Sequence, residues 1–252
     1  MRVATFNILN GRSTVDDRVD LDRFAKAIHE LDADVLGLQE VDRNQPRSNN
    51  ADLTAVAAEA MGAAEHRFVS AVSGTLGGAW TAATGDEGPD SAGYGISLLS
   101  RHPIRSWEVI RLPAAPVKVP WRFPDGGRPV LVRDEPRVAV AAVVDTPEGE
   151  ITIVNTHLSF LTWWNRRQLR RLVQCLRDAP RPLMLLGDLN MGPGPAYQIT
   201  RMQPLVTGLT FPADQPTAQI DHILADGGLP GSAGEVHHFD LSDHRALSVD
   251  FD

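Results

Sequence analysis

Cysteine is almost absent from this sequence, since Cys175 is the only one among 252 residues. A single cysteine excludes an internal disulfide and any metal site built from several thiolates. Because Cys175 falls within a helical pattern, we expect a plain thiol in the core or at its boundary. Long apolar runs are also missing, and none approaches the roughly 20 residues that a membrane-spanning helix needs.

Positive charge is scarce. The chain has 24 Lys and Arg against 32 Asp and Glu, a formal net charge of −8. That balance opposes long-range attraction to a polyanion, so nucleic acid is possible as a partner but not favoured. The N-terminus shows no signal-peptide pattern, and we expect a cytoplasmic protein. Neither a heptad repeat nor a clear apolar surface patch is visible, and we expect a monomer.

The hydrophobic content of 42% is enough for a large core, and no repeat or clean linker divides the chain. We therefore expect one α/β domain over residues 1–252. Apolar spacing predicts helices near 20–32, 53–61 and 163–178. Short apolar runs predict strands at 2–9, 35–41, 66–72, 95–100, 107–112, 138–144, 151–157, 183–188, 220–225 and 246–251. Some neighbouring strands form hairpins, which favours mixed sheets. The remaining stretches, 73–93, 113–136 and the segment up to about 218, are predicted loops.

One apolar strand ends in a conspicuous way. The run Leu183–Leu186 is followed by Gly187, Asp188, Leu189 and Asn190. Side chains alternate along a strand, so Asp188 and Asn190 are expected to point to the same side. A carboxylate at the end of a buried strand either has a partner or takes part in chemistry.

Other predicted strands also end in acid, amide or imidazole groups, namely Asn7, Glu40, His157, Asp221, and the pair Asp243 and His244. Each of these alone is more often a turn or capping residue. Their recurrence favours a site for a hard divalent cation, with Glu40, Asn7 and Asp243 as candidate oxygen ligands. It also suits phosphoester hydrolysis, which needs a metal, a base for water and donors to the phosphoryl oxygens.

Six motifs that contain these residues resemble the endonuclease/exonuclease/phosphatase superfamily. They are TFNILNG at 5–11, LGLQEVD at 36–42, NTHLS at 155–159, LLGDLNMGPG at 185–194, QIDHIL at 219–224 and LSDHRAL at 241–247. They occur in the family's order along nearly the whole chain. The resemblance implies a four-layer α/β sandwich, in which two mixed, mainly antiparallel sheets pack face to face with helices outside.

The resemblance also implies a role for each residue. Glu40 would be the principal ligand of Mg²⁺, for which Mn²⁺ could substitute, with Asn7 and Asp243 at the same metal site. Asp188 would orient or deprotonate the attacking water, and Asn190 would hold the water or a phosphoryl oxygen. The two imidazoles that flank the phosphate would be His157 and His244, the latter oriented by Asp221. Protonated imidazoles and a metal would neutralise the charge that develops on the phosphoryl oxygens.

The sequence departs from the family pattern where a Gly-Asn pair is common and this chain has Gly95 and Ile96. Ile96 cannot supply an amide, so either Tyr94 or Ser97 could take over a phosphate contact. Several family members also carry an arginine near residues 133–137. Arg133 and Arg137 are both candidates for a substrate contact, and an ion pair at the surface is the alternative for each.

Three other features have two readings each. The predicted helix at 163–178 is rich in arginine, which suits either nucleic acid or, more commonly, a solvated helix face. Trp163 and Trp164 could line the substrate cleft or pack in the core. His237 and His238 could bind a transition metal or simply lie at a strand end.

Three functions follow from this reading. The favoured one is Mg²⁺-dependent hydrolysis of a small or lipid-derived phosphomonoester or phosphodiester. The second is a DNA or RNA endonuclease or exonuclease using the same site, for which Lys118, Arg122 and Arg128 offer modest basic support. The third is a catalytically silent binding protein of the same fold, which is ranked last because every central polar position is filled.

Overall fold

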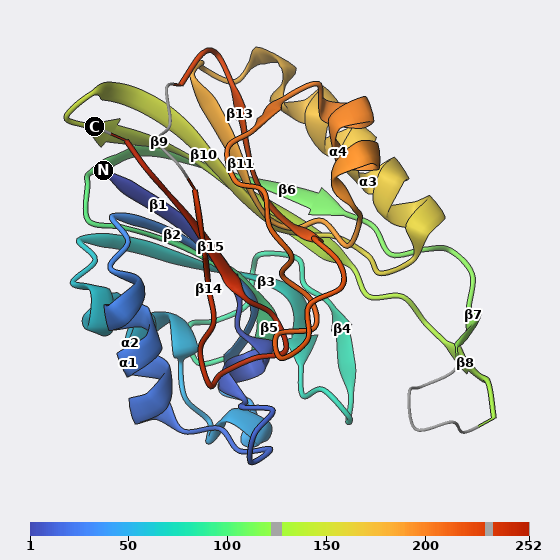
Figure 1. Ribbon diagram of the computed structural model, residues 1–252. Coiled ribbons are helices and arrows are strands. Elements are labelled where there is room, and N and C mark those ends of the chain that lie inside the picture. The colour runs from blue at the N-terminus through green and yellow to red at the C-terminus, as the bar shows by residue number, and fades with distance from the viewer. Residues whose placement is uncertain (122–127, 230–233, 252) are drawn as a thin grey trace.

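The computed structural model describes residues 1–121, 128–229 and 234–251. Two β-sheets lie face to face, with helices on both outer faces (Figure 1). The first sheet has seven strands in the spatial order β14 (Glu235–His237), β15 (Ala246–Asp250), β1 (Arg2–Asn7), β2 (Val35–Arg43), β5 (Gly93–Ser100), β3 (Glu65–Gly74) and β4 (Trp80–Ala82). The second sheet has six, in the order β12 (Gln203–Pro204), β13 (Asp221–Asp226), β11 (Leu183–Asp188), β10 (Gly149–His157), β9 (Arg137–Thr146) and β6 (Ile104–Leu112).

The helices are divided between the two outer faces. They are α1 (Leu21–Leu31), α2 (Leu53–Met61), α3 (Thr162–Cys175) and α4 (Pro193–Thr200), with short 3-10 turns at Leu9–Gly11, Pro46–Ser48 and Leu176–Asp178. The first two cover the seven-stranded sheet, and the other two cover the six-stranded sheet (Figure 1). A separate two-stranded ribbon, β7 (Val119–Trp121) with β8 (Val130–Val132), extends from the body beyond β6 (Figure 1).

Local sequence signals set the ends of the first two helices. Asp20 precedes α1 and its carboxylate accepts hydrogen bonds from the backbone N–H groups of Asp22 and Arg23. Asp52 caps α2 in the same way, and α2 ends at Gly62, which has a φ of +67°. Aspartate before a helix and a left-handed glycine after it are the expected caps, because they satisfy backbone groups that the helix leaves unpaired.

Strand alternation builds the layers. In β1, Val3 faces the space between the two sheets, whereas Ala4 and Phe6 face α1 and α2. In β11, Met184 and Leu186 face the other sheet, whereas Leu183 and Leu185 pack under the helices α3 and α4. The three resulting apolar layers, one between the sheets and one under each helix pair, confirm the four-layer sandwich. Only β1 with β2 and β10 with β11 are parallel pairs among the described strands, which confirms mixed and mainly antiparallel sheets.

Several local predictions were wrong. The segment after residue 190 is not a loop throughout, because it contains α4 and the short β12. The predicted loops 73–93 and 113–136 carry β4, β7 and β8, and residues 122–127 of the second one lie outside the described part. Cys175 is exposed rather than buried, because it ends α3 on the solvent side while its neighbour Leu176 points inward.

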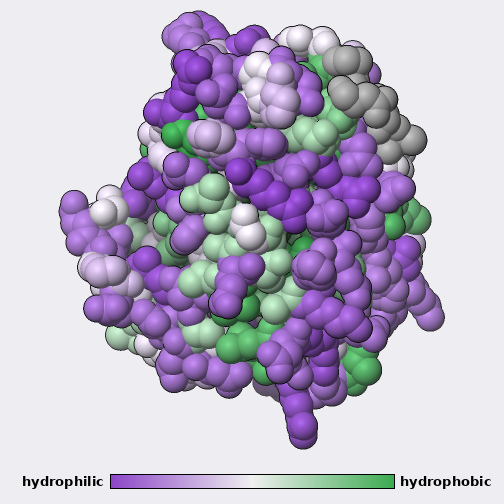
Figure 2. Space-filling view, turned by 90° about the vertical axis from the view of Figure 1, so that its left-hand side faces the viewer, coloured by the Kyte–Doolittle hydropathy of each residue, from purple (hydrophilic) through white to green (hydrophobic). Residues whose placement is uncertain are grey.

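The end of the molecule opposite the polar cluster holds the start of β1 and the end of β15, where Arg2 pairs with Asp250. Both chain termini lie at this end, where hydrophilic residues cover most of the surface around a group of apolar ones (Figure 2). Among the described residues, no helix is long and apolar enough to cross a membrane.

Candidate functional site

Three strands of the second sheet bring an imidazole and two carboxylates into line. His157 ends β10 and pairs in register with Asp188 at the end of the parallel β11. Asp188 in turn pairs with Asp221, which begins the antiparallel β13. An antiparallel strand starts where its neighbour ends. The polar residues of three segments that are distant in sequence therefore lie side by side at the same end of the strands.

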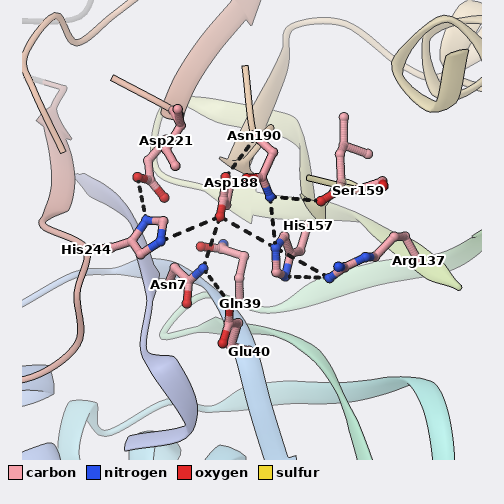
Figure 3. A network of polar contacts seen from close by, with 12 residues as sticks. Asn7, Gln39, Glu40, Arg137, His157, Ser159, Asp188, Asn190, Asp221 and His244 are labelled. Atoms are coloured by element: carbon pink, nitrogen blue, oxygen red, sulfur yellow. Dashed lines mark hydrogen bonds and ion pairs between the residues drawn. The ribbon is translucent and has the colours of Figure 1, made fainter. Parts of the chain in front are cut away.

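The first sheet contributes Asn7 and Glu40. The Asn7 amide donates hydrogen bonds to Glu40 Oε1 at 3.2 Å and to Asp188 Oδ2 at 3.0 Å, and its carbonyl oxygen accepts from the backbone of Leu9 (Figure 3). The sandwich therefore closes around one polar cluster made by both sheets. Asn7 holds the two acids in place through its N–H groups.

The sequence predicted that Glu40 lies at the end of its strand. In the structure the strand continues past Glu40, and a β-bulge brings the carboxylate into the cluster. β2 continues to Arg43, and its pairing with β5 shifts register between Gln39 and Val41. Glu40 adopts a φ of +55°, a left-handed conformation that is uncommon for glutamate. By simple alternation Glu40 would face the helices with Leu36 and Leu38, and Val41 takes that place instead. The bulge thus turns the carboxylate into the site.

His244 and Asp221 form a buried pair. Nδ1 of His244 lies 2.9 Å from Asp221 Oδ2, and both side chains are almost completely buried. Burial opposes a charge on the imidazole, but the adjacent Asp221 carboxylate outweighs it and raises the pKa of His244 to about 10. His244 is therefore cationic at neutral pH. Its Nε2 faces Asp188 Oδ2 and Asp243 Oδ1, each at 3.9 Å.

Asp188 lies at the centre of the cluster (Figure 3). Its Oδ1 accepts a hydrogen bond from the backbone N–H of Asn190 at 2.8 Å, and its Oδ2 lies 3.5 Å from His157 Nε2. Burial, followed by the negative charge of Asp221, raises the pKa of Asp188 to about 7. A carboxyl group with that pKa can accept a proton near neutral pH.

Asn190 lies beside Asp188, although β11 ends at Asp188 and strand alternation does not extend to Asn190. Its side-chain amide donates to the Leu158 carbonyl oxygen at 3.0 Å and lies 3.3 Å from His157 Nε2. A φ of +50° at Asn190 bends the chain directly after the strand, which brings the amide back over His157.

Arg137, and not Arg133, contacts the cluster directly. Its Nη1 lies 3.1 Å from His157 Nδ1, and the whole side chain is buried. Burial, together with the positive charges of Arg137 and His244, holds the pKa of His157 well below its usual value. The sequence-based expectation of two protonated imidazoles is therefore not met, because His157 is the neutral one here.

Apart from Asn7 and Asp221, the residues of this cluster line a pocket of about 620 Å³ that also includes Glu135, Phe211 and Ile220. Tyr94 lies in its wall, and burial together with the negative charge of Glu40 raises the pKa of its hydroxyl well above the usual value. Ile96 instead faces the core between the sheets, and the Ser97 hydroxyl is hydrogen-bonded to Thr54. Of the two residues considered as replacements for the family amide, Tyr94 is the one that borders the pocket.

The charge balance of the site favours a cation. Five carboxylates, those of Glu40, Glu135, Asp188, Asp243 and the adjoining Asp221, face the guanidinium groups of Arg133 and Arg137 and the His244 imidazolium. Asp243 Oδ1 and Asp221 Oδ1 are buried without a hydrogen-bond partner. Within the described residues, the ligand atoms of Asp188, Asp221 and His244 lie within 4.8 Å of one another, so this group could bind a metal. Excess acid and unpaired carboxylate oxygens are what a divalent cation would neutralise.

A supporting layer beneath the site was not predicted. Asn155 donates to the carbonyl oxygens of Leu38 and Ser97 in the opposite sheet, at 2.9 and 2.8 Å, and accepts from Gln39 Nε2 at 2.7 Å. Both residues occur in the motifs already quoted, so their amides at inward-facing strand positions were the available signal. A buried amide needs partners, and here the two sheets supply them to each other.

The remaining candidates lie elsewhere. Trp164 packs against Ala115 and Leu161, and Trp163 is half exposed, so neither lines the pocket. His237 lies in β14 and contacts the Ser248 hydroxyl at 2.7 Å. The arginines of α3 form its exposed face, as is usual for a solvated helix. Lys118 and Arg128 are also exposed, and Arg122 lies outside the described residues.

Comparisons with known proteins agree with this architecture. A family model described as "Endonuclease/Exonuclease/phosphatase family" matches residues 4–244. A solved structure described as an endonuclease/exonuclease/phosphatase from Beutenbergia cavernae is 23% identical, with a TM-score of 0.68 over 99% of this chain and 70% of that one. A mannosyl-6-phosphatase from Bacteroides thetaiotaomicron is 15% identical, with a TM-score of 0.65 over 99% and 98% of the two chains. Sphingomyelinase C from Streptomyces griseocarneus is 15% identical, with a TM-score of 0.64 over 100% and 99%. The curated proteins contain no match.

Proposed function

The chain belongs to the endonuclease/exonuclease/phosphatase family of phosphoric ester hydrolases, and we propose that it hydrolyses a small or lipid-derived phosphoester with Asp188 as the base for water. The observation that carries this proposal is the buried cluster in which Asp188 lies between a cationic His244 and a neutral His157. Phosphoryl transfer needs a base and fixed positive charge in one place, and this cluster offers both.

Each residue has a task that its contacts support. Asp188, with a pKa of about 7, accepts the proton of the attacking water. The His244 imidazolium, held by Asp221, stabilises the negative charge that builds on the phosphoryl oxygens. Asn190 orients the water or one phosphoryl oxygen through its amide, and Arg137 adds a second fixed positive charge beside His157.

Mg²⁺ fits the acidic side of the pocket. Glu40 and Asp243 would hold it, since Mg²⁺ prefers oxygen ligands and one buried oxygen of Asp243 has no hydrogen-bond partner among the described residues. Asn7 would hold Glu40 in position by its N–H group. A bound Mg²⁺ supplies a Lewis acid that polarises the phosphoryl group.

The preference for a small or lipid-derived substrate over nucleic acid rests on charge. The net charge is −8, and the only arginines that line the pocket among described residues are Arg133 and Arg137. A protein that grips a nucleic-acid backbone neutralises several phosphates in a row. Two relatives of the same fold support the proposal, since one is described as a phosphatase and one as a sphingomyelinase.

The test is a substrate panel with Mg²⁺ or Mn²⁺, made of phosphomonoesters, phosphodiesters and supercoiled plasmid. We expect turnover of small esters that is lost on chelation and falls by about 10³-fold or more in Asp188→Asn. Asp178→Asn, at an exposed aspartate in the 3-10 turn Leu176–Asp178, is the matched control and keeps the wild-type rate.

Two results would contradict the proposal. Plasmid nicking that exceeds turnover of every small ester, and that Asp188→Asn abolishes, would establish a nuclease instead. Absence of turnover with either metal would favour a binding protein of the same fold.

A further inference from the structure

A second space adjoins the catalytic pocket. It has a volume of about 970 Å³ and lies between β4 and the segment Pro113–Pro116. We call it the side cleft, and its lining consists of residues 73–74, 78–82, 113–116, 133–134 and 136. Arg133 lines both the side cleft and the catalytic pocket, so the two spaces lie on either side of one residue.

One wall of the side cleft is held rigidly. The carbonyl oxygen of Pro113 accepts hydrogen bonds from Trp164 Nε1 at 2.8 Å and from Gln168 Nε2 at 3.0 Å. The backbone N–H of Ala115 donates to the buried Asp134 carboxylate at 2.8 Å, whose other oxygen accepts from Ser159 at 2.7 Å. These contacts tie the wall to the segment that follows His157, so the cleft is formed before any ligand arrives.

The opposite wall is β4, which pairs with residues 72–74 of β3. Trp80 and Ala82 lie on the same face of this strand, because side chains alternate. Figure 1 shows β4 reaching toward the same side of the molecule as the β7–β8 ribbon. The tryptophan therefore offers a broad apolar surface across from the proline segment.

The chemistry of the lining limits what can bind there. Trp80 faces a lining that is otherwise mostly alanine, proline and glycine. Of the described residues in that lining, Arg133 is the only base, and Asp134 is the only acid and is already hydrogen-bonded on both oxygens. A nucleic-acid strand would need a row of positive charges here, whereas an uncharged apolar group needs none.

We propose that the side cleft binds the apolar alcohol part of the phosphoester, an alkyl or aryl group, and that Trp80 is the residue that selects it. The phosphate lies in the catalytic pocket, and Arg133 lies where the ester enters the cleft. This inference rests on the proposed function, since it takes hydrolysis at Asp188 as given. It narrows the substrate class to phosphoesters of apolar alcohols.

The experiment measures kcat/KM for a series of alkyl phosphomonoesters and methyl alkyl phosphodiesters, from ethyl to decyl, below their aggregation concentrations. In the wild-type enzyme kcat/KM rises by up to about fourfold for each methylene that the cleft buries. Trp80→Ala lowers this dependence on chain length, so kcat/KM falls more for decyl esters than for ethyl esters. Trp163→Ala, which removes a half-exposed tryptophan outside the cleft, behaves as wild type.

A second variant guards against a folding defect in Trp80→Ala. Ala82→Trp adds volume to the cleft from an exposed position, so it should reduce kcat/KM more for decyl esters than for ethyl esters. A flat response to chain length in the wild-type enzyme would overturn the proposal, as would an equal loss for ethyl and decyl esters in both variants. Trp80-dependent turnover of oligonucleotides in preference to alkyl esters would also overturn it.

Binding separates this inference from the proposed function. Calorimetry with decylphosphonate and ethylphosphonate needs no turnover. Tighter binding of the decyl compound that depends on Trp80, without hydrolysis of any ester, would support the side cleft and refute the proposed function. Hydrolysis of the esters without any preference for the decyl compound would support the proposed function and refute the role of the side cleft.

Discussion

Replacing Asp221 by asparagine removes one negative charge from the site at nearly constant side-chain size. Asp221 Oδ2 lies 2.9 Å from Nδ1 of His244, and its charge keeps the pKa of His244 at about 10 although burial opposes it. Without that charge the pKa of His244 falls, because burial still opposes the charged imidazole and only the charges of Asp188 and Asp243 remain to raise it. At pH 8 the protonated fraction of His244 is then lower than in the wild-type enzyme.

The expected loss in kcat/KM at pH 8 is about 10²- to 10³-fold. Part of this loss comes from the smaller fraction of enzyme with a protonated His244. The rest comes from the imidazole, which Asp221 no longer holds in a fixed orientation. A divalent cation remains held by other carboxylates, so activity falls without vanishing.

The pH profile distinguishes this reasoning from a general loss. Wild-type activity rises as Asp188 deprotonates and declines at high pH as His244 deprotonates. In Asp221→Asn the alkaline limb moves to lower pH, because the pKa of His244 falls. The acid limb also moves to lower pH, because the charge of Asp221 helps to raise the pKa of Asp188. A cation beside Asp188 would lower the pKa of Asp188, and so move the acid limb to lower pH, in both proteins. The quantity to compare is therefore the difference in the pH of the acid limb between wild type and Asp221→Asn.

The matched control is Asp226→Asn, at the far end of the same strand, where the carboxylate pairs with Arg181 on the surface. It should keep the wild-type profile. Thermal unfolding of all three proteins shows whether Asp221→Asn folds normally. A wild-type rate at pH 8, or an equal loss at every pH with both limbs in place, would refute the role given to the Asp221–His244 pair.

Three further predictions concern the support of the site. Asn155→Ala removes two hydrogen bonds to buried carbonyl oxygens of the opposite sheet and the acceptor of Gln39 Nε2, and should lower the free energy of unfolding by about 3 kcal/mol, as measured by urea denaturation. Gly187→Ala should destabilise by about 3 kcal/mol or more, since its Cβ would collide with the Thr156 carbonyl oxygen, whereas Gly149→Ala has a similarly positive φ and open space around it and should cost much less. Glu40→Gln should weaken Mg²⁺ binding by about tenfold or more in calorimetry while the unfolding temperature changes little, and unchanged affinity would remove Glu40 from the ligand set.

Much of the site was predictable because each polar residue directly ends or begins a recognisable apolar strand. His157, Asp188 and Asp221 are brought together by strand pairing alone, which depends on the same apolar patterns that define the strands. The order of the six motifs then placed Asn7 and His244 with them. Their mutual distances required the structure.

Other features depend on contacts that no local pattern encodes. Arg133 and Arg137 are four residues apart, and only the start of β9 decides that Arg137 turns inward to His157. That contact in turn makes His157 neutral, so its charge could not be inferred from its position in a motif. The helix α4 was missed because its first turn holds Pro193 and Pro195, which indicate a loop by composition but fit the first turn of a helix equally well.

Glu40 shows a signal that was present but unused. Apolar residues facing α1 and α2 recur at Leu36 and Leu38 with a spacing of two, and the next one is Val41, at a spacing of three. A strand that stays paired can change parity in this way only by inserting a residue, which is the definition of a bulge. The change in apolar spacing from two residues to three therefore predicts a bulge at Glu40. Its side chain then points away from α1 and α2, whereas simple alternation would point it toward them.

The inward-facing positions of the central strands share one gradient from apolar to ionisable. Along β1 the series is Val3, Thr5 and Asn7, and along β10 it is Ile153, Asn155 and His157. The middle members meet between the sheets, where Gln39 donates to both Thr5 and Asn155. An apolar layer stabilises the sandwich at one end, an uncharged hydrogen-bonded layer comes next, and the charged groups lie at the open end, where a pocket and a cation can compensate them. Buried charge is costly and buried amides are tolerated only when paired, so this order allows a reactive cluster to rest directly on a stable core. It also explains why the middle layer matters for function although none of its residues reaches the pocket.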